Sequence, residues 1–145
     1  MNSISSVSSH LTQEEYKRLK IYEQRYRDSA RSIFTDRVKY YHTFTGGNYT
    51  SITIRDQKTR WGSCSSRGTL SFNYRLIFAP QKVLDYVVVH ELCHLTHMNH
   101  SKDFWNMVEQ VMPDYKTYKN WLREHETELN LITHLEKHGI PIKLT

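Results

Sequence analysis

The sequence predicts an α+β fold with a long N-terminal helix, a small antiparallel sheet and C-terminal helices around one core. Apolar residues recur at three- and four-residue steps over positions 16–41 and again after position 82, as in helices that pack on one face. Between these regions, apolar and polar residues alternate at 52–54 and 70–75, as in half-buried strands. The 145 residues suit one domain.

The N-terminal helix is predicted to begin after a capping box. Residues 1–10 are Ser-rich and lack periodicity, so we expect a flexible terminus followed by a single domain over 11–145. Thr12 and Glu15 have the T-x-x-E spacing in which each side chain bonds the other's backbone N–H. The expected inward stripe of this helix consists of Tyr16, Leu19, Tyr22, Tyr26, Ala30, Ile33, Phe34 and Tyr41.

Three short strands are expected next, at 52–54, 60–65 and 70–75. Tight turns between them favour antiparallel pairing. In the third strand one face would be apolar and the other polar, the polar face consisting of Ser71, Asn73 and Arg75.

The C-terminal half reads as three helices. Pro80 suits a first helical turn, and the helix after it is apolar around much of its circumference, so we expect it to be buried. Ser101 is the expected cap of a second helix, and Asp114 that of the last.

The buried helix carries an H-E-x-x-H motif, His90-Glu91-Leu92-Cys93-His94. Residues four apart share a helix face, so the two imidazoles can converge on one Zn²⁺. Glu91 is displaced around the helix and is placed to take a proton from a water held by the metal. The motif therefore predicts a catalytic metal site.

A third ligand is needed to complete such a site. His100 lies six residues after His94, and Asn99 before it tolerates a turn that brings it back. We favour His100, with Glu109 and His97 as the alternatives. Asp103 or Glu109 is expected to orient a ligand histidine.

Composition sets the remaining limits. Lys and Arg exceed Asp and Glu by 20 − 15 = 5. This excess is compatible with nucleic-acid binding, but we favour the interpretation that the basic side chains form a solvated surface. Cys64 and Cys93 are too few for a disulfide framework, and for Cys64 a buried structural thiol is favoured over a regulatory metal ligand. We expect a cytoplasmic protein, since we see neither a signal sequence nor a membrane span.

These stretches resemble the YgjP-like branch of the SprT-like zinc metallopeptidases, within the wider zincin fold. The resemblance covers residues 55–125 and is carried by residues 58–65 (KTRWGSCS), residues 70–76 (LSFNYRL) and the HELCHL motif with its continuation to Trp105. It implies a zincin-like core, one Zn²⁺ per chain held by His90, His94 and His100, and Glu91 as catalytic base.

The leading functional hypothesis is hydrolysis of peptide bonds in a peptide or protein substrate. The family's pattern places the third strand beside the metal helix, so we expect its free backbone edge to border the cleft and to bind an extended peptide. The candidate residues for substrate binding or for stabilising the oxyanion are Asn73, Tyr74, Arg75, His97 and Tyr118.

Two alternatives use other substrates. YgjP-like proteins are also associated with hydrolysis of nucleoside triphosphates, notably UTP, which would suit the cations Arg55, Lys58, Arg60 and Arg75, although the chain has no Gly-rich phosphate loop. SprT-like relatives include DNA-associated proteases, but no zinc ribbon or recognition helix is evident here.

Overall fold

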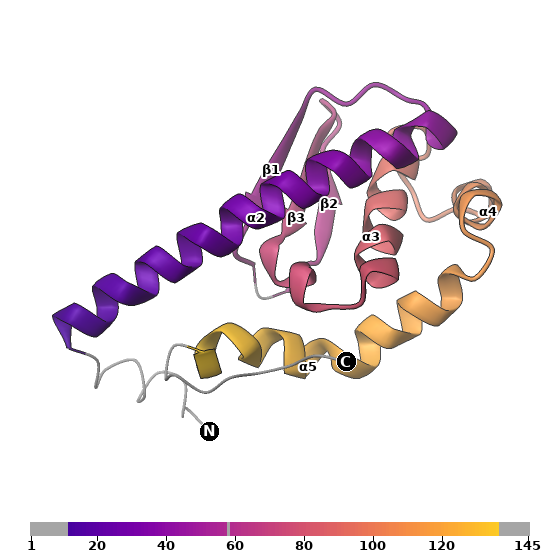
Figure 1. The fold of residues 1–145 in the computed structure, drawn as a ribbon. Helices are drawn as coiled ribbons and strands as arrows, with labels where there is room; N and C mark the ends of the chain where they lie inside the picture. Colours follow the sequence, from indigo (N-terminus) through magenta and orange to yellow (C-terminus); the bar gives the residue numbers. More distant parts are fainter. Residues whose placement is uncertain (1–11, 58, 137–145) are drawn as a thin grey trace.

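The structure, a computed structural model, describes residues 12–57 and 59–136, with side chains described as far as residue 130. The predicted flexible segment 1–10 lies outside the described residues. The elements follow in the order α2 (Gln13–Thr45), β1 (Ser51–Arg55), β2 (Gly62–Cys64), β3 (Thr69–Asn73), the 3₁₀ helix η1 (Tyr74–Phe78), α3 (Gln81–Cys93), α4 (Lys102–Val111) and α5 (Tyr115–Glu136). The fold is α+β: α2 crosses the sheet, α3 lies beside it, and α5 runs beneath (Figure 1).

The capping box at the start of α2 is confirmed. The Thr12 hydroxyl accepts from the Glu15 backbone N–H at 3.1 Å, and the Glu15 carboxylate accepts from the Thr12 N–H at 3.3 Å. From Ala30 onward the buried residues recur at three- and four-residue steps, namely Ala30, Phe34, Val38, Tyr41 and Thr45. The packed face of α2 is therefore in its C-terminal half.

The predicted stripe is wrong at three of its N-terminal and outer positions. Tyr16, Tyr22 and Ile33 are 54%, 50% and 38% exposed. Among the described residues, the main core takes no side chain of α2 before Tyr26, whose ring packs edge-on against Phe78. The N-terminal part of α2 extends beyond the core, so its apolar residues keep the helical spacing but stay exposed.

The sheet is mixed, so the expectation of a wholly antiparallel sheet is wrong. Its order is β1-β3-β2, with β1 parallel and β2 antiparallel to β3. A parallel pair needs a crossover of about a dozen residues. The segment 56–68 supplies that length and contains β2 itself, which returns through a tight turn at Gly68, where φ is +88°.

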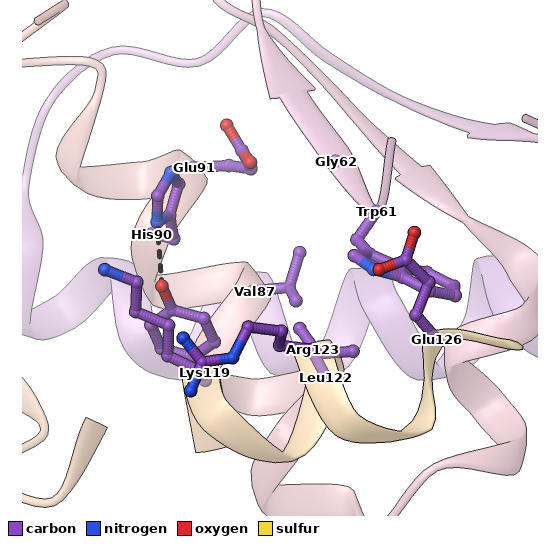
Figure 2. A pocket seen from close by; sticks show the side chains of 10 residues that line it. Trp61, Gly62, Val87, His90, Glu91, Lys119, Leu122, Arg123 and Glu126 are labelled. Carbon is purple, nitrogen blue, oxygen red and sulfur yellow. Dashed lines mark hydrogen bonds between the residues drawn. The ribbon is translucent and has the colours of Figure 1, made fainter. Parts of the chain in front are cut away.

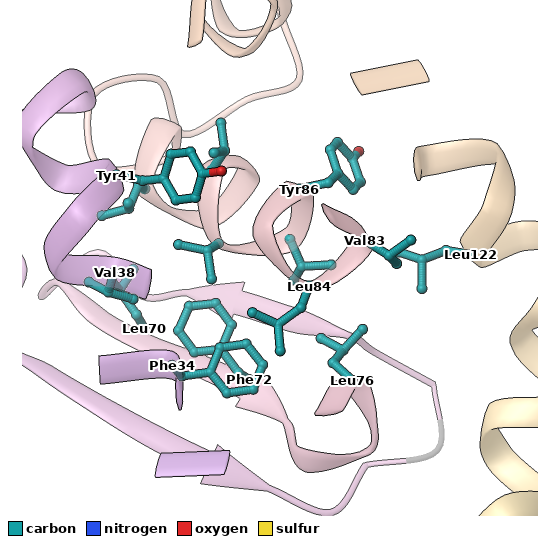
Figure 3. Close-up of a cluster of buried hydrophobic side chains, with 14 of the residues drawn as sticks. Phe34, Val38, Tyr41, Leu70, Phe72, Leu76, Val83, Leu84, Tyr86 and Leu122 are labelled. Atoms are coloured by element: carbon teal, nitrogen blue, oxygen red, sulfur yellow. The ribbon is translucent and has the colours of Figure 1, made fainter. Parts of the chain in front are cut away.

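The central position of β3 contradicts a second expectation. β3 is paired on both sides, so its backbone has no free edge for a substrate. The strand also ends earlier than predicted, because the Asn73 side chain accepts from the Arg75 backbone N–H at 3.0 Å and starts η1. Neither face of β3 is solvated: Ser71 and Asn73 are buried, and Phe72 stacks on Phe34 of α2 at 4.5 Å (Figure 3).

The helix α3 is buried on nearly all sides, as predicted, and an ionic contact fixes it against α2. Arg37 donates to both carboxylate oxygens of Asp85, at 2.8 and 3.0 Å, and the Tyr41 hydroxyl donates to the same carboxylate at 3.1 Å. The Asp85 side chain is only 2% exposed. The buried Asp85 carboxylate needs these three bonds to stay charged, and they form only when α2 and α3 lie in this register.

The last two helices close the fold. The Ser101 hydroxyl accepts from the Phe104 backbone N–H at 3.2 Å, which confirms the predicted cap of α4. One core cluster of the described residues includes side chains from α2 through α5. A single domain over 11–145 stays a prediction. Within the described chain, we find no helix with the length and apolar character needed to cross a membrane.

Candidate active site

Three histidines meet where α3 ends. His90 lies in the last turn of α3, which ends at Cys93, and His94 is its C-terminal cap residue. The backbone N–H groups of Thr96 and His97 donate to the Cys93 carbonyl oxygen at 3.2 and 3.0 Å and turn the chain back. This turn returns His100 to the helix end, so the three rings come together.

The three Nε2 atoms form an equilateral triangle. The distances His90–His94, His94–His100 and His100–His90 are each 3.2 Å. In a tetrahedral site with Zn–N distances of about 2.0–2.1 Å, the nitrogens lie roughly 3.3–3.4 Å apart. The triangle therefore matches three corners of a zinc tetrahedron and leaves the fourth corner for water or substrate.

Hydrogen bonding alone does not account for this triangle. A neutral ring nitrogen is either donor or acceptor, so at most two of the three pairs can be hydrogen bonds. His94 Nδ1 donates to the carbonyl oxygen of His97 at 2.9 Å, which leaves a lone pair on its Nε2. His90 Nδ1 lies 3.2 Å from the Tyr86 hydroxyl, marked by the dashed line in Figure 2. Bonds of this kind hold metal-ligating histidines in place.

The surroundings favour the neutral form of His90 and His94. Burial lowers the pKa of His90 to about 3, and His94, His100 and Lys119 add to the same shift. Burial is also the main cause that lowers the pKa of His94. Since a metal binds only the neutral imidazole, both histidines are in the form that a ligand needs.

Aromatic rings support the histidines from α4. Phe104 stacks on His94 at 4.3 Å, and Trp105 stacks on His100 at 5.8 Å. Phe104 is fully buried, while Trp105 is half-buried and packs against the core. These rings restrict the imidazole orientations, so the ligand set is largely preorganised.

Glu91 lies beside the histidines in a dry environment. Glu91 is only 5% exposed. Burial raises the pKa of its carboxyl to about 8, while the charge of Arg60 acts to lower it. A general base works best when its pKa is close to the working pH. Gly62 of β2 packs directly on this carboxylate, since a Cβ at position 62 would lie 3.0 Å from Oε2. Glu91 is thus enclosed between α3 and β2.

A cavity of about 320 Å³ opens beside His90 and Glu91. This is within the size range of small-ligand pockets. Its walls are α3, the start of β2 and one face of α5 (Figure 2). The lining residues are Trp61, Gly62, Tyr86, Val87, His90, Glu91, Lys119, Leu122, Arg123 and Glu126.

The residues predicted to bind substrate from the third strand have structural partners. The Asn73 amide donates to the carbonyl oxygens of Gln57 and Arg60. Arg75 forms an ion pair with Asp56 at 2.6 Å and lies over the Tyr74 ring at 4.9 Å. None of the three is among the described residues that line the cavity, and their role in substrate binding stays a prediction.

The other candidates also have defined places. His97 contributes its backbone carbonyl to His94, and the Tyr118 hydroxyl donates to Asp114 at 2.7 Å. Among the described residues, the group that could hold a metal contains neither His97 nor Glu109. Burial raises the pKa of the Cys64 thiol to about 11, and the Glu91 carboxylate adds a smaller effect in the same direction. The sulfur therefore stays a thiol.

Sequence reasoning missed four residues of the site. Tyr86 precedes His90 by one helical turn, so the shared helix face was an available signal. A glycine inside a strand, such as Gly62, indicates close approach of another group. Lys119 and Arg123 give no comparable signal, because solvated cations at this spacing are common on amphipathic helices.

The comparisons with known proteins agree with this geometry. A family model for the YgjP-like metallopeptidase domain matches residues 2–125. The fold is similar to the crystal structure of the metallopeptidase zymogen of Pyrococcus abyssi abylysin, with a TM-score of 0.56 and 23% identity over 63% of this chain and 93% of that chain. No curated protein matches the chain. The match over most of its length shows that the chain belongs to the family of YgjP-like metallopeptidases and is a metal-dependent peptidase.

Proposed function

We propose that this protein hydrolyses peptide bonds with one Zn²⁺, held by His90, His94 and His100, and with Glu91 as general base. The observation that carries the proposal is the 3.2 Å triangle of Nε2 atoms next to a buried carboxylate. A structural zinc site is closed by four protein ligands and needs no base. Here three nitrogens and an adjoining cavity are typical of an open, catalytic site.

The chain's own residues account for the proton transfers. When bound, Zn²⁺ supplies a Lewis acid and lowers the pKa of its water to about 7. Glu91 accepts a proton from the attacking water as the water oxygen bonds to the peptide carbonyl carbon. The C–N bond then breaks, and Glu91 returns the proton to the leaving nitrogen. Burial of Glu91 favours both transfers, because its raised pKa lets it hold the proton between them.

The outer edge of β2 is the proposed docking site for the peptide. β2 pairs only with β3 in the described sheet, and its Gly62 lines the cavity beside Glu91. An extended peptide adds to such an edge through backbone hydrogen bonds. This replaces the earlier expectation for β3, whose two edges are both paired.

The test compares the parent protein with two carboxylate variants on an unstructured protein substrate. Glu91→Gln removes the base and keeps the shape, so we expect retained folding and zinc with roughly 10²–10⁴-fold slower hydrolysis. Glu124→Gln, at an exposed position on α5 that is not among the cavity-lining residues, is the matched control and is expected to keep zinc and activity. A zinc-loaded Glu91→Gln protein that hydrolyses the substrate at the parent rate would refute the mechanism.

Hydrolysis of nucleoside triphosphates and DNA association stay predictions. Of the cations named for a phosphate substrate, Arg55 lies 3.5 Å from the Ser71 hydroxyl, Arg75 is paired with Asp56, and Lys58 lies outside the described residues. Adding UTP as a parallel substrate to the same assay tests the first. A steep fall of DNA affinity with salt would support the second.

A further inference from the structure

One wall of the cavity carries two cations. Lys119, Leu122, Arg123 and Glu126 lie at positions i, i+3, i+4 and i+7 of α5, so they share a helix face. Leu122 is buried in the core and fixes this face toward the cavity. Lys119 extends beside His90, whereas Glu126 stands next to Trp61 at the other end (Figure 2). The cationic end of the cavity is therefore the end nearest the histidines.

These two cations are positioned without being neutralised. Lys119 Nζ lies 4.2 Å from the centre of the Trp105 ring, and Arg123 donates to Asn120 at 3.3 Å. Among the described residues, no carboxylate lies within 4 Å of the charged group of Lys119 or of Arg123. Like charges four residues apart on a helix are unfavourable unless an anion lies between them or near them.

The cavity is close enough to the reacting groups for its occupant to be part of the substrate. His90 and Glu91 line the same space as Lys119 and Arg123. Successive residues of an extended peptide are about 3.3–3.6 Å apart. A group held by the two cations thus belongs to a residue near the scissile bond.

We propose that Lys119 and Arg123 form a subsite for a carboxylate of the peptide substrate, adjacent to the bond that is cleaved. The proposal rests on the peptidase function above and adds its substrate class, peptides with an acidic group beside the scissile bond. An Arg guanidinium pairs with a carboxylate through parallel N–H donors, and the nearby ammonium adds a second charge. The carboxylate belongs either to an Asp or Glu side chain or to the C-terminus of the peptide.

A set of fluorogenic peptides tests the subsite. Each position around the cleavage site carries Glu or Gln in turn, and each peptide has a free or an amidated C-terminus. We expect the parent protein to prefer Glu over Gln at one position, or a free terminus over an amide, by roughly 10-fold in kcat/KM. The first result assigns a side-chain carboxylate and the second a terminal one. The measured quantity is this ratio, which is insensitive to active-site loading.

Variants then assign the preference to the two cations. Lys119→Gln and Arg123→Gln are each expected to reduce the ratio by about 3- to 10-fold. Lys119→Arg, which keeps the charge, restores it, and Lys119→Glu shifts the preference toward Lys-containing peptides. Lys116→Gln is the matched control, an exposed cation on α5 that is not among the cavity-lining residues.

The possible results separate the two proposals. Cleavage without a charge preference, or with a preference that survives both neutral variants, overturns the subsite and leaves the peptidase function standing. If no peptide is cleaved, tryptophan fluorescence titrations with the Glu and Gln peptides replace the rates. Preferential binding that Lys119→Gln abolishes would keep the subsite without the proposed function. Lys119-dependent hydrolysis of UTP, with no preference among peptides, would reassign the cations to phosphate.

Discussion

Replacing Gly62 by alanine tests how closely β2 encloses the Glu91 carboxylate. A Cβ at this position would lie 3.0 Å from Glu91 Cγ, 3.0 Å from Glu91 Oε2 and 3.0 Å from Val87 Cγ1. An ordinary contact begins near 3.4 Å, so Glu91 and β2 have to separate by about 0.4 Å. Gly62 is not among the described glycines with positive φ, so the effect arises from this contact and not from backbone strain.

The expected loss follows from the size of that displacement. A shift of about 1 Å in a reacting group can cost about 100-fold in rate. A shift of 0.4 Å therefore predicts a kcat roughly 3- to 10-fold lower for Gly62→Ala, with zinc retained. The assay is steady-state cleavage of a fluorogenic peptide, with zinc content measured on the same sample.

Gly46→Ala is the control for a glycine substitution as such. Gly46 has a φ of +64° and a ψ of −153°, and nothing lies within 4 Å of an added Cβ. Alanine there costs about 1–3 kcal/mol of stability through backbone strain, and kcat should not change. A Gly62→Ala protein with full zinc occupancy and the parent kcat would refute the close fit between β2 and Glu91.

Three further predictions concern the metal and the core. His100→Ala should weaken zinc binding by well over the 10- to 100-fold typical of losing a ligand's supporting bond, measured by competition with a chelator; equal affinity would exclude His100 as a ligand. Tyr86→Phe should weaken zinc by roughly 10- to 100-fold while the fold persists, and an unchanged affinity would remove Tyr86 from the support of His90. Phe34→Ala removes a fully buried ring stacked on Phe72 and should cost about 3–5 kcal/mol in denaturant unfolding; a loss below 1 kcal/mol would contradict the packing described.

Features that depend on neighbours within one helical turn were predictable from the sequence. The capping box at Thr12, the cap at Ser101 and the convergence of His90 with His94 all involve residues three or four apart. Their geometry is a property of the helix itself. The return of His100 was expected from a left-handed turn at Asn99, and this reason is wrong, because no non-Gly residue of the described chain has a positive φ. The chain turns instead where the Thr96 and His97 N–H groups bond to the Cys93 carbonyl oxygen.

The sheet order could not be read from the same local signals. Alternation located the first and third strands, but it does not distinguish a neighbour in sequence from a neighbour in space. β3 lies between β1 and β2, which pairs both of its edges, and other parts of the chain cover both of its faces, so its polar residues Ser71 and Asn73 are buried. Ser71 then bonds to Thr53 at 2.6 Å, and Asn73 bonds to loop carbonyls, where the alternation had suggested solvent or substrate.

The position of the third histidine has a consequence for how the metal is kept. His90 and His94 belong to a buried helix, whereas His100 lies in an exposed stretch. Backbone hydrogen bonds to Cys93 and the bond from His94 to the His97 carbonyl fix the start of that stretch, and at its end the Trp105 ring stacks on His100. With zinc bound, the metal would act as a covalent-like cross-link for residues 98–100, which closes a short loop at small entropic cost. Hydrogen exchange and proteolysis on chelation should therefore change first at Met98–His100, and metal exchange should proceed by release of His100 before the two helical ligands.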